Sequence, residues 1–308
     1  MKKKKGIIIT VCVLALVAAI LVPLFLIPRP AVKKIAVIPL TGTITMEGSS
    51  SYSGSTITPD LVESYLRRAK EDAAVKAVVL RIESSGGEIA SCQEILWQIE
   101  RFKEAKPVVV CMGGTAASGG YYISSKANKI VALPSTLTGS IGVISAVINI
   151  EELLEKLGIK IEIFKGGEYK DMYRGFRELT PEERVIMKEM VDEYYEQFVE
   201  VVAEGRGLSK EDVRALATGQ AYTGTKAKEL GLVDELGDLD KAIDLALELA
   251  GLEEAMVEYY RPPRFTLWSL LGLVDAIKMR ISGFSAQDIL LLEILSHSYR
   301  QPLFLYLS

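Results

Sequence analysis

Ser118 is the residue of this sequence best suited to act as a nucleophile. An apolar run, 107–112, ends at two glycines, and one serine among small residues then stands at the predicted start of a helix. The chain contains a single histidine, His297, in an apolar segment near its end. A serine–histidine–aspartate triad is therefore not expected, and a neutral lysine amine is the known alternative that can accept the proton of a serine. The question is then which lysine side chain is buried, so that its amine can be neutral.

Two glycine pairs follow predicted strands, and the first of them could bind the negative charge that develops during acyl transfer. Gly86-Gly87 follow two serines, and Gly113-Gly114 precede Ser118. Glycine lets the backbone approach a ligand closely, and backbone N–H groups at a tight turn stabilise an oxyanion. A glycine pair also marks an ordinary turn between a strand and a helix. The serine motif one strand later favours the oxyanion interpretation for Gly86-Gly87.

Composition excludes several other kinds of site. One histidine cannot supply an HExxH zinc motif, and Cys12, Cys92 and Cys111 show no CxxC spacing. We therefore expect no metal and no cofactor. Cys92 and Cys111 are expected to be buried free thiols, with one disulfide between them as the alternative. The formal charge of −4 becomes −8 when Lys2 to Lys5 are left out, and an acidic domain disfavours nucleic acid as a partner.

The first thirty residues predict a membrane anchor. Four lysines precede an apolar run without charge, 6–27, and Pro28-Arg29-Pro30 follow it. About 20 apolar residues span a bilayer, whereas a cleaved signal has a shorter apolar core that ends in small residues. A cleaved signal and a buried helix are the alternatives. Because lysines beside a span stay in the cytoplasm, we expect a single-pass protein of the cell membrane whose chain after Pro30 is extracytoplasmic.

Downstream of Lys33, predicted strands alternate with predicted helices. The strands are expected at 34–40, 77–82, 108–112, 129–133 and 141–147, and the helices at 60–72, 89–102 and 116–125. Thr180 and Pro181 open a long helix that ends near Gly205, and Ser209 opens another. This alternation predicts right-handed crossovers and a parallel sheet with helices on both faces. Functional loops should then lie at the carboxyl ends of the strands.

Four ordered motifs make the sequence similar to signal peptide peptidase A, a family of membrane-anchored serine proteases. They are Ser84-Ser-Gly-Gly87, Gly113-Gly-Thr-Ala-Ala-Ser-Gly-Gly-Tyr-Tyr122, Thr138-Gly-Ser-Ile-Gly-Val143 and Gly167-Glu-Tyr-Lys-Asp171. The resemblance runs from about Lys33 to Ala250, and the family usually has proline where this chain has Ser85. It implies an α/β fold of the ClpP/crotonase-like type with repeated βαβ units. It also implies a serine–lysine dyad and the cleavage of remnant signal peptides.

The resemblance assigns a role to each site residue. Ser118 is the expected nucleophile and Lys170 the general base, while the hydroxyl of Ser140 hydrogen-bonds the lysine amine. The N–H groups of Gly87 and Gly119 would form the oxyanion hole.

A lysine accepts a proton only when its amine is neutral, and burial in an apolar pocket favours the neutral form. Glu168 and Asp171 would oppose this if they faced the pocket of Lys170, so we expect both to face elsewhere, with a turn between Glu168 and Lys170. Lys126 is nearer to Ser118 in sequence, but about two turns along the same helix place it too far from the hydroxyl.

The sequence divides into three parts. Residues 1–30 are the cytoplasmic lysines and the transmembrane anchor, 31–250 the protease domain, and 251–308 an apolar extension. The extension is expected to pack on the sheet or to form an interface, with a membrane contact as the third possibility. The last residues, 301–308, should be extended because of Pro302, either closing their own subunit or occupying a neighbouring active site.

The partners implied by the resemblance are peptide substrates, the membrane and further copies of the chain, in a homo-oligomer with sites at subunit boundaries. Three other functions stay open. They are a related protease that trims stomatin-like proteins, a crotonase-like acyl-CoA enzyme and a non-catalytic membrane scaffold. A fluorophosphonate probe separates the serine hydrolases from the others, because only an activated Ser118 reacts with it covalently.

Overall fold

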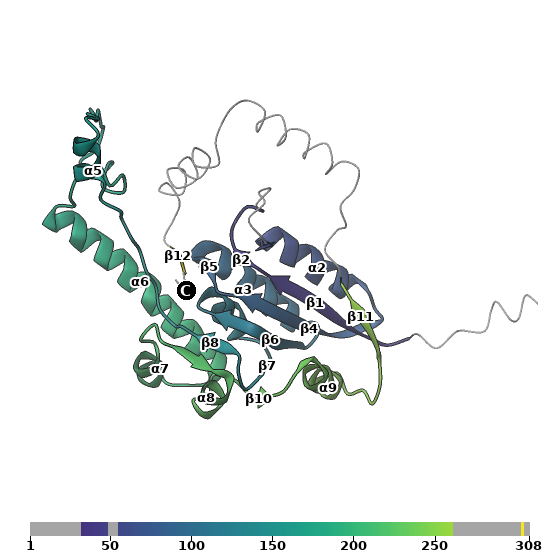
Figure 1. The fold of residues 1–308 in the computed structure, drawn as a ribbon. Helices are drawn as coiled ribbons and strands as arrows, with labels where there is room; N and C mark the ends of the chain where they lie inside the picture. Colours follow the sequence, from purple (N-terminus) through teal and green to yellow (C-terminus); the bar gives the residue numbers. More distant parts are fainter. Residues whose placement is uncertain (1–31, 49–54, 261–302, 305–308) are drawn as a thin grey trace, which may run out of the picture. The chain divides into compact units, whose positions relative to one another are not determined.

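The computed structural model describes residues 32–48, 55–260 and 303–304. Its main sheet has a central path of parallel pairings (Figure 1). The strands along this path are, in spatial order, β10 (Glu235–Leu236), β7 (Lys129–Ala132), β6 (Val108–Ala117), β4 (Val75–Ser84), β1 (Lys34–Thr41) and β11 (Met256–Tyr259). The described part of the chain is therefore a mixed α/β fold, as the sequence predicted. The anchor expected at 6–27 and His297 lie outside the described residues.

Strand β6 changes its neighbour half-way along. Residues 109–111 pair with β7, and residues 115–117 pair with β8 (Leu137–Gly139). β8 in turn pairs antiparallel with β9 (Ala221–Thr223). This arrangement brings the carboxyl ends of β6 and β8 side by side, immediately before Ser118 and Ser140.

Helices cover both faces of the sheet. One face packs against α2 (Pro59–Glu71), α3 (Ile89–Lys103), α4 (Gly119–Ser124) and α6 (Pro181–Arg206), and the other packs against α9 (Leu239–Leu249) (Figure 1). Side chains of a strand point alternately to its two faces. Ile35 and Val37 accordingly belong to the cluster around α9, while Ile38 belongs to the larger cluster on the opposite face.

Two helices begin at Thr180 and Ser209, the capping residues that the sequence indicated. Thr180 accepts a hydrogen bond from the N–H of Glu183, whose side chain returns to the Thr180 N–H, and Pro181 occupies the first turn. Ser209 caps α7 (Lys210–Leu216), and Thr223 caps α8 (Gly224–Glu229). These side chains satisfy N–H groups that have no partner within the helix.

Two sequence predictions differ from the structure. Ala116 and Ala117 belong to β6, because they pair with β8, and the helix begins only after Ser118. The predicted strand at 141–147 is not a strand of either sheet. Ile141 is buried in the core, but Ile144 is 43% exposed and Ile148, just after the segment, is 69% exposed, so the chain leaves the core within this segment.

Residues 142–178, which we call the arm, leave the sheet after β8 and run alongside α6 to α5, which lies beyond the amino-terminal end of α6 (Figure 1). The arm contains α5 (Glu151–Lys156), which has no buried residue. A hydrogen bond of 2.8 Å from Ile150 N to Gly175 O joins the segment before α5 to the segment that returns toward α6. Many apolar side chains of the arm are exposed. They are Ile144, Ile148, Leu153, Leu157, Ile159, Ile161, Ile163, Phe164, Tyr169 and Tyr173. This surface is the kind that another protein surface covers.

The described chain beyond Ala250 contributes strands to both sheets. β11 pairs with β1, so the main sheet continues to Tyr259. β12 (Leu303–Phe304) is extended, as predicted, and pairs antiparallel with β5 (Gly87–Glu88) of a second, smaller sheet that also contains β2 (Thr43–Ile44) and β3 (Thr56–Ile57). The apolar segments at 265–274 and 289–295 lie outside the described residues. Within the described ranges, no helix combines the length and the apolar character needed to cross a membrane.

Candidate active site

Ser118 stands at the junction of β6 and α4 in a backbone conformation that few serines adopt. Its φ is 53° and its ψ is −119°, and the side chain is buried, with the residue 1% exposed. A hydrogen bond of 2.8 Å from Ser118 N to Gly139 O ties it to the neighbouring strand. Residues other than glycine with positive φ are uncommon, and they cluster at functional sites where the surrounding structure imposes them. A sharp strand-to-helix turn of this kind presents a serine hydroxyl at the end of a sheet.

The two glycines expected to supply the oxyanion hole lie against each other. A Cβ added at Gly119 would lie 3.1 Å from the backbone nitrogen of Gly87 and 2.6 Å from Cys92 Sγ. A Cβ added at Gly87 would lie 1.9 Å from the carbonyl oxygen of Ile44. Both positions therefore require glycine for space, and the backbone of the glycine loop reaches the first residue after Ser118.

Glu83 holds the irregular part of β6 that leads to Ser118. Ile82 pairs with Met112 and Ser84 with Ala116, so three residues of β6 lie opposite the single residue Glu83. The Glu83 carboxylate accepts hydrogen bonds from the N–H groups of these extra residues, at 2.7 Å from Gly114 N and 2.9 Å from Thr115 N. N–H groups that would otherwise lack a partner in the sheet are thereby satisfied.

Two threonines complete the support of this bulge. Thr136 Oγ1 donates to Gly113 O at 2.7 Å, and Thr138 Oγ1 donates to Ala116 O at 2.7 Å. Sequence reasoning missed the role of Glu83 and of both threonines, because their contacts follow from the register between β4, β6 and β8. The only signal in the sequence was the position of Glu83 directly before the first glycine motif.

Ser140 also has a positive φ, of 49°, at the end of β8. Its backbone N donates to Gln220 O at 3.0 Å, and its hydroxyl donates to Gly219 O at 3.3 Å. Because Gly139 accepts the hydrogen bond from Ser118 N, the structure brings Ser118 and Ser140 together at neighbouring strand ends.

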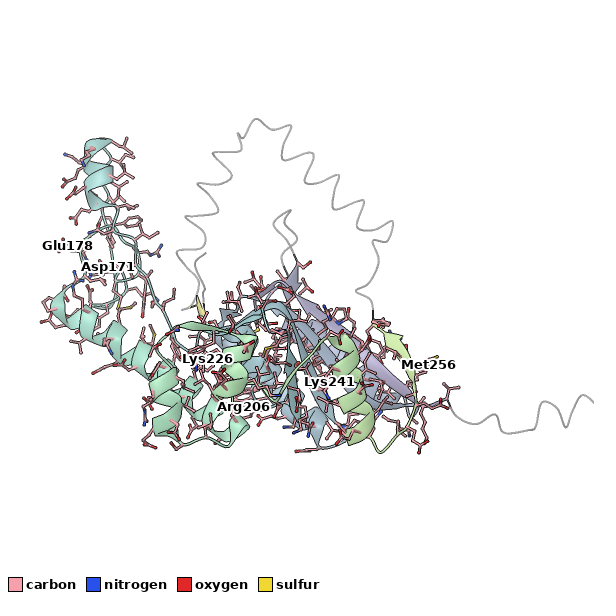
Figure 2. The ribbon with its side chains drawn as sticks, turned by 60° about the horizontal axis from the view of Figure 1, so that its bottom comes forward. Asp171, Glu178, Arg206, Lys226, Lys241 and Met256 are labelled. Carbon is pink, nitrogen blue, oxygen red and sulfur yellow. The ribbon has the colours of Figure 1, made fainter. Side chains whose placement is uncertain are left out.

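Within a single chain, Lys170 is far from Ser118 and Ser140. It is exposed in a turn of the arm, next to Asp171, which Figure 2 places at the far end of α6. The expected turn between Glu168 and Lys170 is present, and Asp171 is buried while Lys170 is exposed. Asp171 and Glu183 bind the same arginine.

The length of α6 gives the approximate distance between the Lys170 turn and the Ser118 region. Phe198, fifteen residues after Glu183, packs against Tyr122 with ring centroids 5.1 Å apart, and Tyr122 is one turn from Ser118. At 1.5 Å per residue, this places the Lys170 turn about 22 Å from the Ser118 region along α6.

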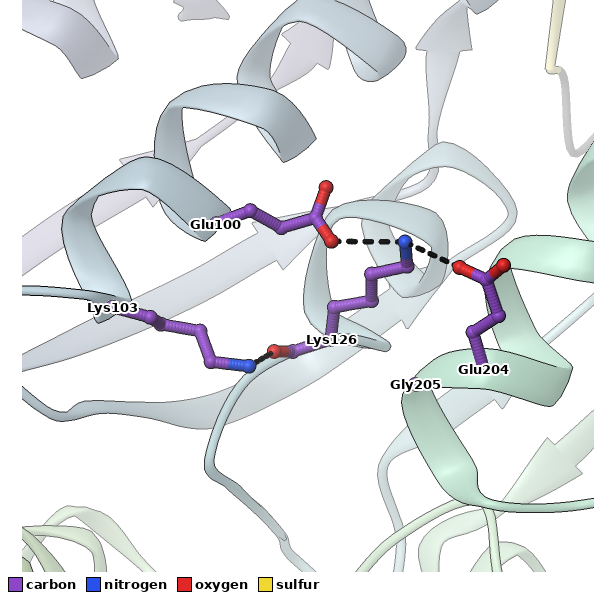
Figure 3. A pocket seen from close by; sticks show the side chains of 5 residues that line it. All are labelled: Glu100, Lys103, Lys126, Glu204 and Gly205. Atoms are coloured by element: carbon purple, nitrogen blue, oxygen red, sulfur yellow. Dashed lines mark hydrogen bonds and ion pairs between the residues drawn. The ribbon is translucent and has the colours of Figure 1, made fainter.

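Lys126 and Lys129, the first two lysines after Ser118 in the sequence, both lie beside carboxylates. Lys126 Nζ lies 2.9 Å from Glu100 and 2.8 Å from Glu204, in a polar cleft that Lys103 also lines (Figure 3). Burial alone would lower the pKa of Lys126, but the hydrogen bonds that its ammonium donates to Glu204 and Glu100 outweigh burial and raise the pKa. Lys129 Nζ lies 3.9 Å from Asp234. Lys126 is thus held in its charged form and is unsuited to accept a proton.

Comparison with known proteins identifies the family. The sequence model of peptidase family S49 matches residues 100–253. Over 228 residues the chain is 41% identical to a putative protease of Synechocystis sp., a match that covers 73% of this chain and 78% of the relative. The chain belongs to peptidase family S49. It is therefore a serine protease that acts on peptides.

Other relatives of this S49 peptidase carry more specific names. It is 38% identical over 231 residues to a putative signal peptide peptidase SppA of Enterococcus faecium, covering 74% of this chain and 67% of the relative. It is 40% identical over 228 residues to Protease 4 of Salmonella typhi, covering 74% of this chain but 36% of that longer relative.

Two solved structures are similar at lower identity. A mutant of a membrane-bound stomatin-specific protease is 17% identical with a TM-score of 0.49, and the match covers 76% of this chain and 100% of that one. A ClpP1 mutant from Listeria monocytogenes is 17% identical with a TM-score of 0.47, covering 67% and 94%.

The cysteines of the S49 peptidase that the structure describes agree with expectation. Cys92 and Cys111 are buried free thiols. Burial raises the pKa of the Cys92 thiol well above its ordinary value, so Cys92 stays protonated beside Gly119. It lines the site as a small apolar group and does not compete with Ser118 as a nucleophile.

Proposed function

We propose that this chain is a membrane-anchored endopeptidase that degrades remnant signal peptides, with Ser118 as nucleophile and Lys170 as general base. The observation that carries the proposal is the backbone of Ser118, bent to positive φ at the end of β6 with the Gly87 nitrogen beside Gly119. The Enterococcus faecium relative named as a putative signal peptide peptidase supports the substrate class.

The chemistry follows from these positions. The Ser118 hydroxyl attacks the carbonyl carbon of the scissile peptide bond while its proton passes to the neutral amine of Lys170. The carbonyl oxygen becomes an oxyanion, which accepts hydrogen bonds from the N–H groups of Gly87 and Gly119. When the intermediate collapses, the lysine gives its proton to the departing amine and an acyl-enzyme forms. Water then releases the second product by the same steps, with Ser140 holding the lysine amine in place.

The site is completed across a subunit boundary in a ClpP/crotonase-like homo-oligomer. Within one chain the turn of Lys170 is about 22 Å from the Ser118 region along α6, several times the length of a lysine side chain. The exposed apolar residues of the arm need a partner surface, and the partner that also needs a lysine at Ser118 is a second copy of this chain. Docking of the arm would remove water from Lys170 and so favour its neutral form.

Residues 6–27 would anchor the assembly in the cell membrane, with the protease domain on the extracytoplasmic side. Signal peptides that remain in the bilayer after cleavage are apolar and about as long as a membrane span. An anchored assembly meets such substrates at the membrane surface.

A fluorophosphonate probe tests this function. The full chain in detergent should be labelled at Ser118, and the Ser118→Ala variant should not be labelled. Lys170→Ala should fold and assemble but lose both labelling and cleavage of a synthetic signal peptide, and the double variant should be no worse than either single variant. Near-normal activity of Lys170→Ala would show that the dyad is wrongly assigned.

A further inference from the structure

The base of the arm contains a compact group of ion pairs directly beside Lys170. The guanidinium of Arg177 binds Asp171 through Nε at 3.0 Å and Nη2 at 2.9 Å. The same guanidinium binds Glu183 through Nη1 at 2.8 Å and Nη2 at 2.6 Å. Lys165 Nζ adds a contact of 2.7 Å to Asp171 Oδ1. We refer to Asp171, Arg177 and Glu183 as the carboxylate clamp.

The carboxylates of the clamp are buried, unlike most of the arm. Asp171 is 7% exposed and Glu183 is 1% exposed. The hydrogen bonds from Arg177 hold the pKa of Asp171 well below its usual range and lower the pKa of Glu183 to about 2. Both carboxylates are therefore ionised wherever the protease works, and the two positive charges of Arg177 and Lys165 balance them.

The clamp determines where the backbone of Lys170 lies. Asp171, the next residue, points inward to Arg177, and hydrogen bonds from Met172 N to Tyr169 O and from Arg174 N to Asp171 O shape the turn. Arg177 connects this turn to Glu183 in the first turn of α6. α5 has no buried residue, and Met172, within the turn, is the one buried apolar side chain of the arm, so apolar packing holds the turn at one point only.

We propose that the carboxylate clamp is a positioning device for Lys170, with Arg177 as its central residue; this rests on the proposed function of Lys170 as general base. Lysine has a long flexible side chain, so its amine is placed accurately only if its backbone is fixed. A misplacement of about 1 Å at a reacting group can lower a rate about 100-fold. Only a guanidinium can bind two carboxylates with paired hydrogen bonds, so a lysine at position 177 would hold the turn less well.

The test compares Arg177→Met with a matched control, Arg214→Met. Arg214 also binds a carboxylate of α6 through two nitrogens, at 3.2 Å and 2.7 Å from Glu196, but does not contact the arm turn. Steady-state kinetics on a fluorogenic peptide and light scattering are measured on full-length protein in detergent. For Arg177→Met we expect kcat to fall about 100-fold with the mass of the assembly unchanged, and KM to change less than about threefold. Arg214→Met should change neither constant.

Arg177→Lys provides a second variant, because it keeps a positive charge between the buried carboxylates and avoids leaving both unpaired. We expect it to assemble with kcat about tenfold below that of the unmodified chain. In a Lys170→Ala background, which has no peptidase activity to lose, adding Arg177→Met should leave the mass of the assembly unchanged, since the clamp acts through Lys170. Loss of assembly there would indicate a general structural role and overturn the proposal.

Two other outcomes separate the proposal from the function on which it rests. If Arg177→Met keeps normal kcat while Lys170→Ala is inactive, the clamp does not position the base. If Arg177→Met loses activity only because it no longer assembles, the clamp is structural and the proposal is again wrong. If Lys170→Ala itself is active, the assignment of the general base is wrong instead.

Discussion

Mixing two inactive variants should restore activity if each site takes its serine and its lysine from different chains. The variants are Ser118→Ala, which keeps Lys170, and Lys170→Ala, which keeps Ser118. Phe198 contacts Tyr122 near Ser118, whereas Glu183 contacts the arm through Arg177. The fifteen residues of α6 between Phe198 and Glu183 separate the two functional groups of one chain by about 22 Å.

The expected size of the effect follows from this separation. In a ring with equal amounts of the two variants in random order, about one quarter of the boundaries join an intact Ser118 to an intact Lys170. Peptidase activity should therefore reach about one quarter of that of the unmodified assembly. If both residues acted within one chain, no boundary would be functional and the mixture would stay inactive.

The assay needs proof that subunits exchange. Fluorescent labels on the two variants report exchange by energy transfer, and hydrolysis of a fluorogenic peptide is followed in the same sample. Replacing the Lys170→Ala partner by the double variant is the control, because it contributes no intact serine. Full energy transfer without any recovery of activity, or a monomer that is fully active, would refute a shared site.

Three further predictions concern the support of the site. Glu83→Gln leaves only one acceptor oxygen for two N–H groups and should lower the free energy of unfolding by about 1–2 kcal/mol, with slower fluorophosphonate labelling of Ser118; an unchanged urea transition and labelling rate would contradict the role of Glu83. Because the pKa of Glu183 is lowered to about 2 in the folded state, the stability from the clamp is present above the unfolded carboxylate pKa of about 4 and is lost as the pH falls through the folded value. Urea unfolding at several pH values below 5 should then show a larger acid loss for the unmodified chain than for Arg177→Met, and equal losses would count against this. Deleting residues 301–308 removes β12 from β5 and should speed cleavage of a short peptide; unchanged kinetics with a lower melting temperature would mean that the tail only closes its own subunit.

Local chemistry made much of the fold predictable. Thr180 and Pro181 marked the start of α6 because an N-cap and a first-turn proline act through neighbouring backbone atoms. Apolar runs located the buried strands. The segment 141–147 was predicted wrongly because only its first residue, Ile141, is buried in the core, whereas Ile144 is exposed on the arm. No pattern within one chain distinguishes a residue buried in the core from one that another surface covers.

The candidate site was predictable only in part. Ser118 and the glycines belong to compact motifs, so their roles could be read from adjacent residues. Glu83 and Arg177 could not be found in this way. Glu83 depends on the register between β4 and β6, and Arg177 depends on how the arm folds onto α6. Contacts between elements that are distant in sequence leave no local pattern.

The backbone of Ser118 also has a consequence for protein engineering. A side chain at a φ of 53° and a ψ of −119° is held there at a cost, typically about 1–3 kcal/mol, that the rest of the fold must offset. Glycine adopts positive φ without that cost. Ser118→Gly should therefore be inactive and have a higher free energy of unfolding than the active protease. Ser118→Ala should be inactive without this gain in stability, because alanine has the same backbone strain. The backbone conformation that catalysis needs at this position thus lowers the stability of the fold. In a relative that no longer needs catalysis, replacement of the serine by glycine would be favoured because it increases stability.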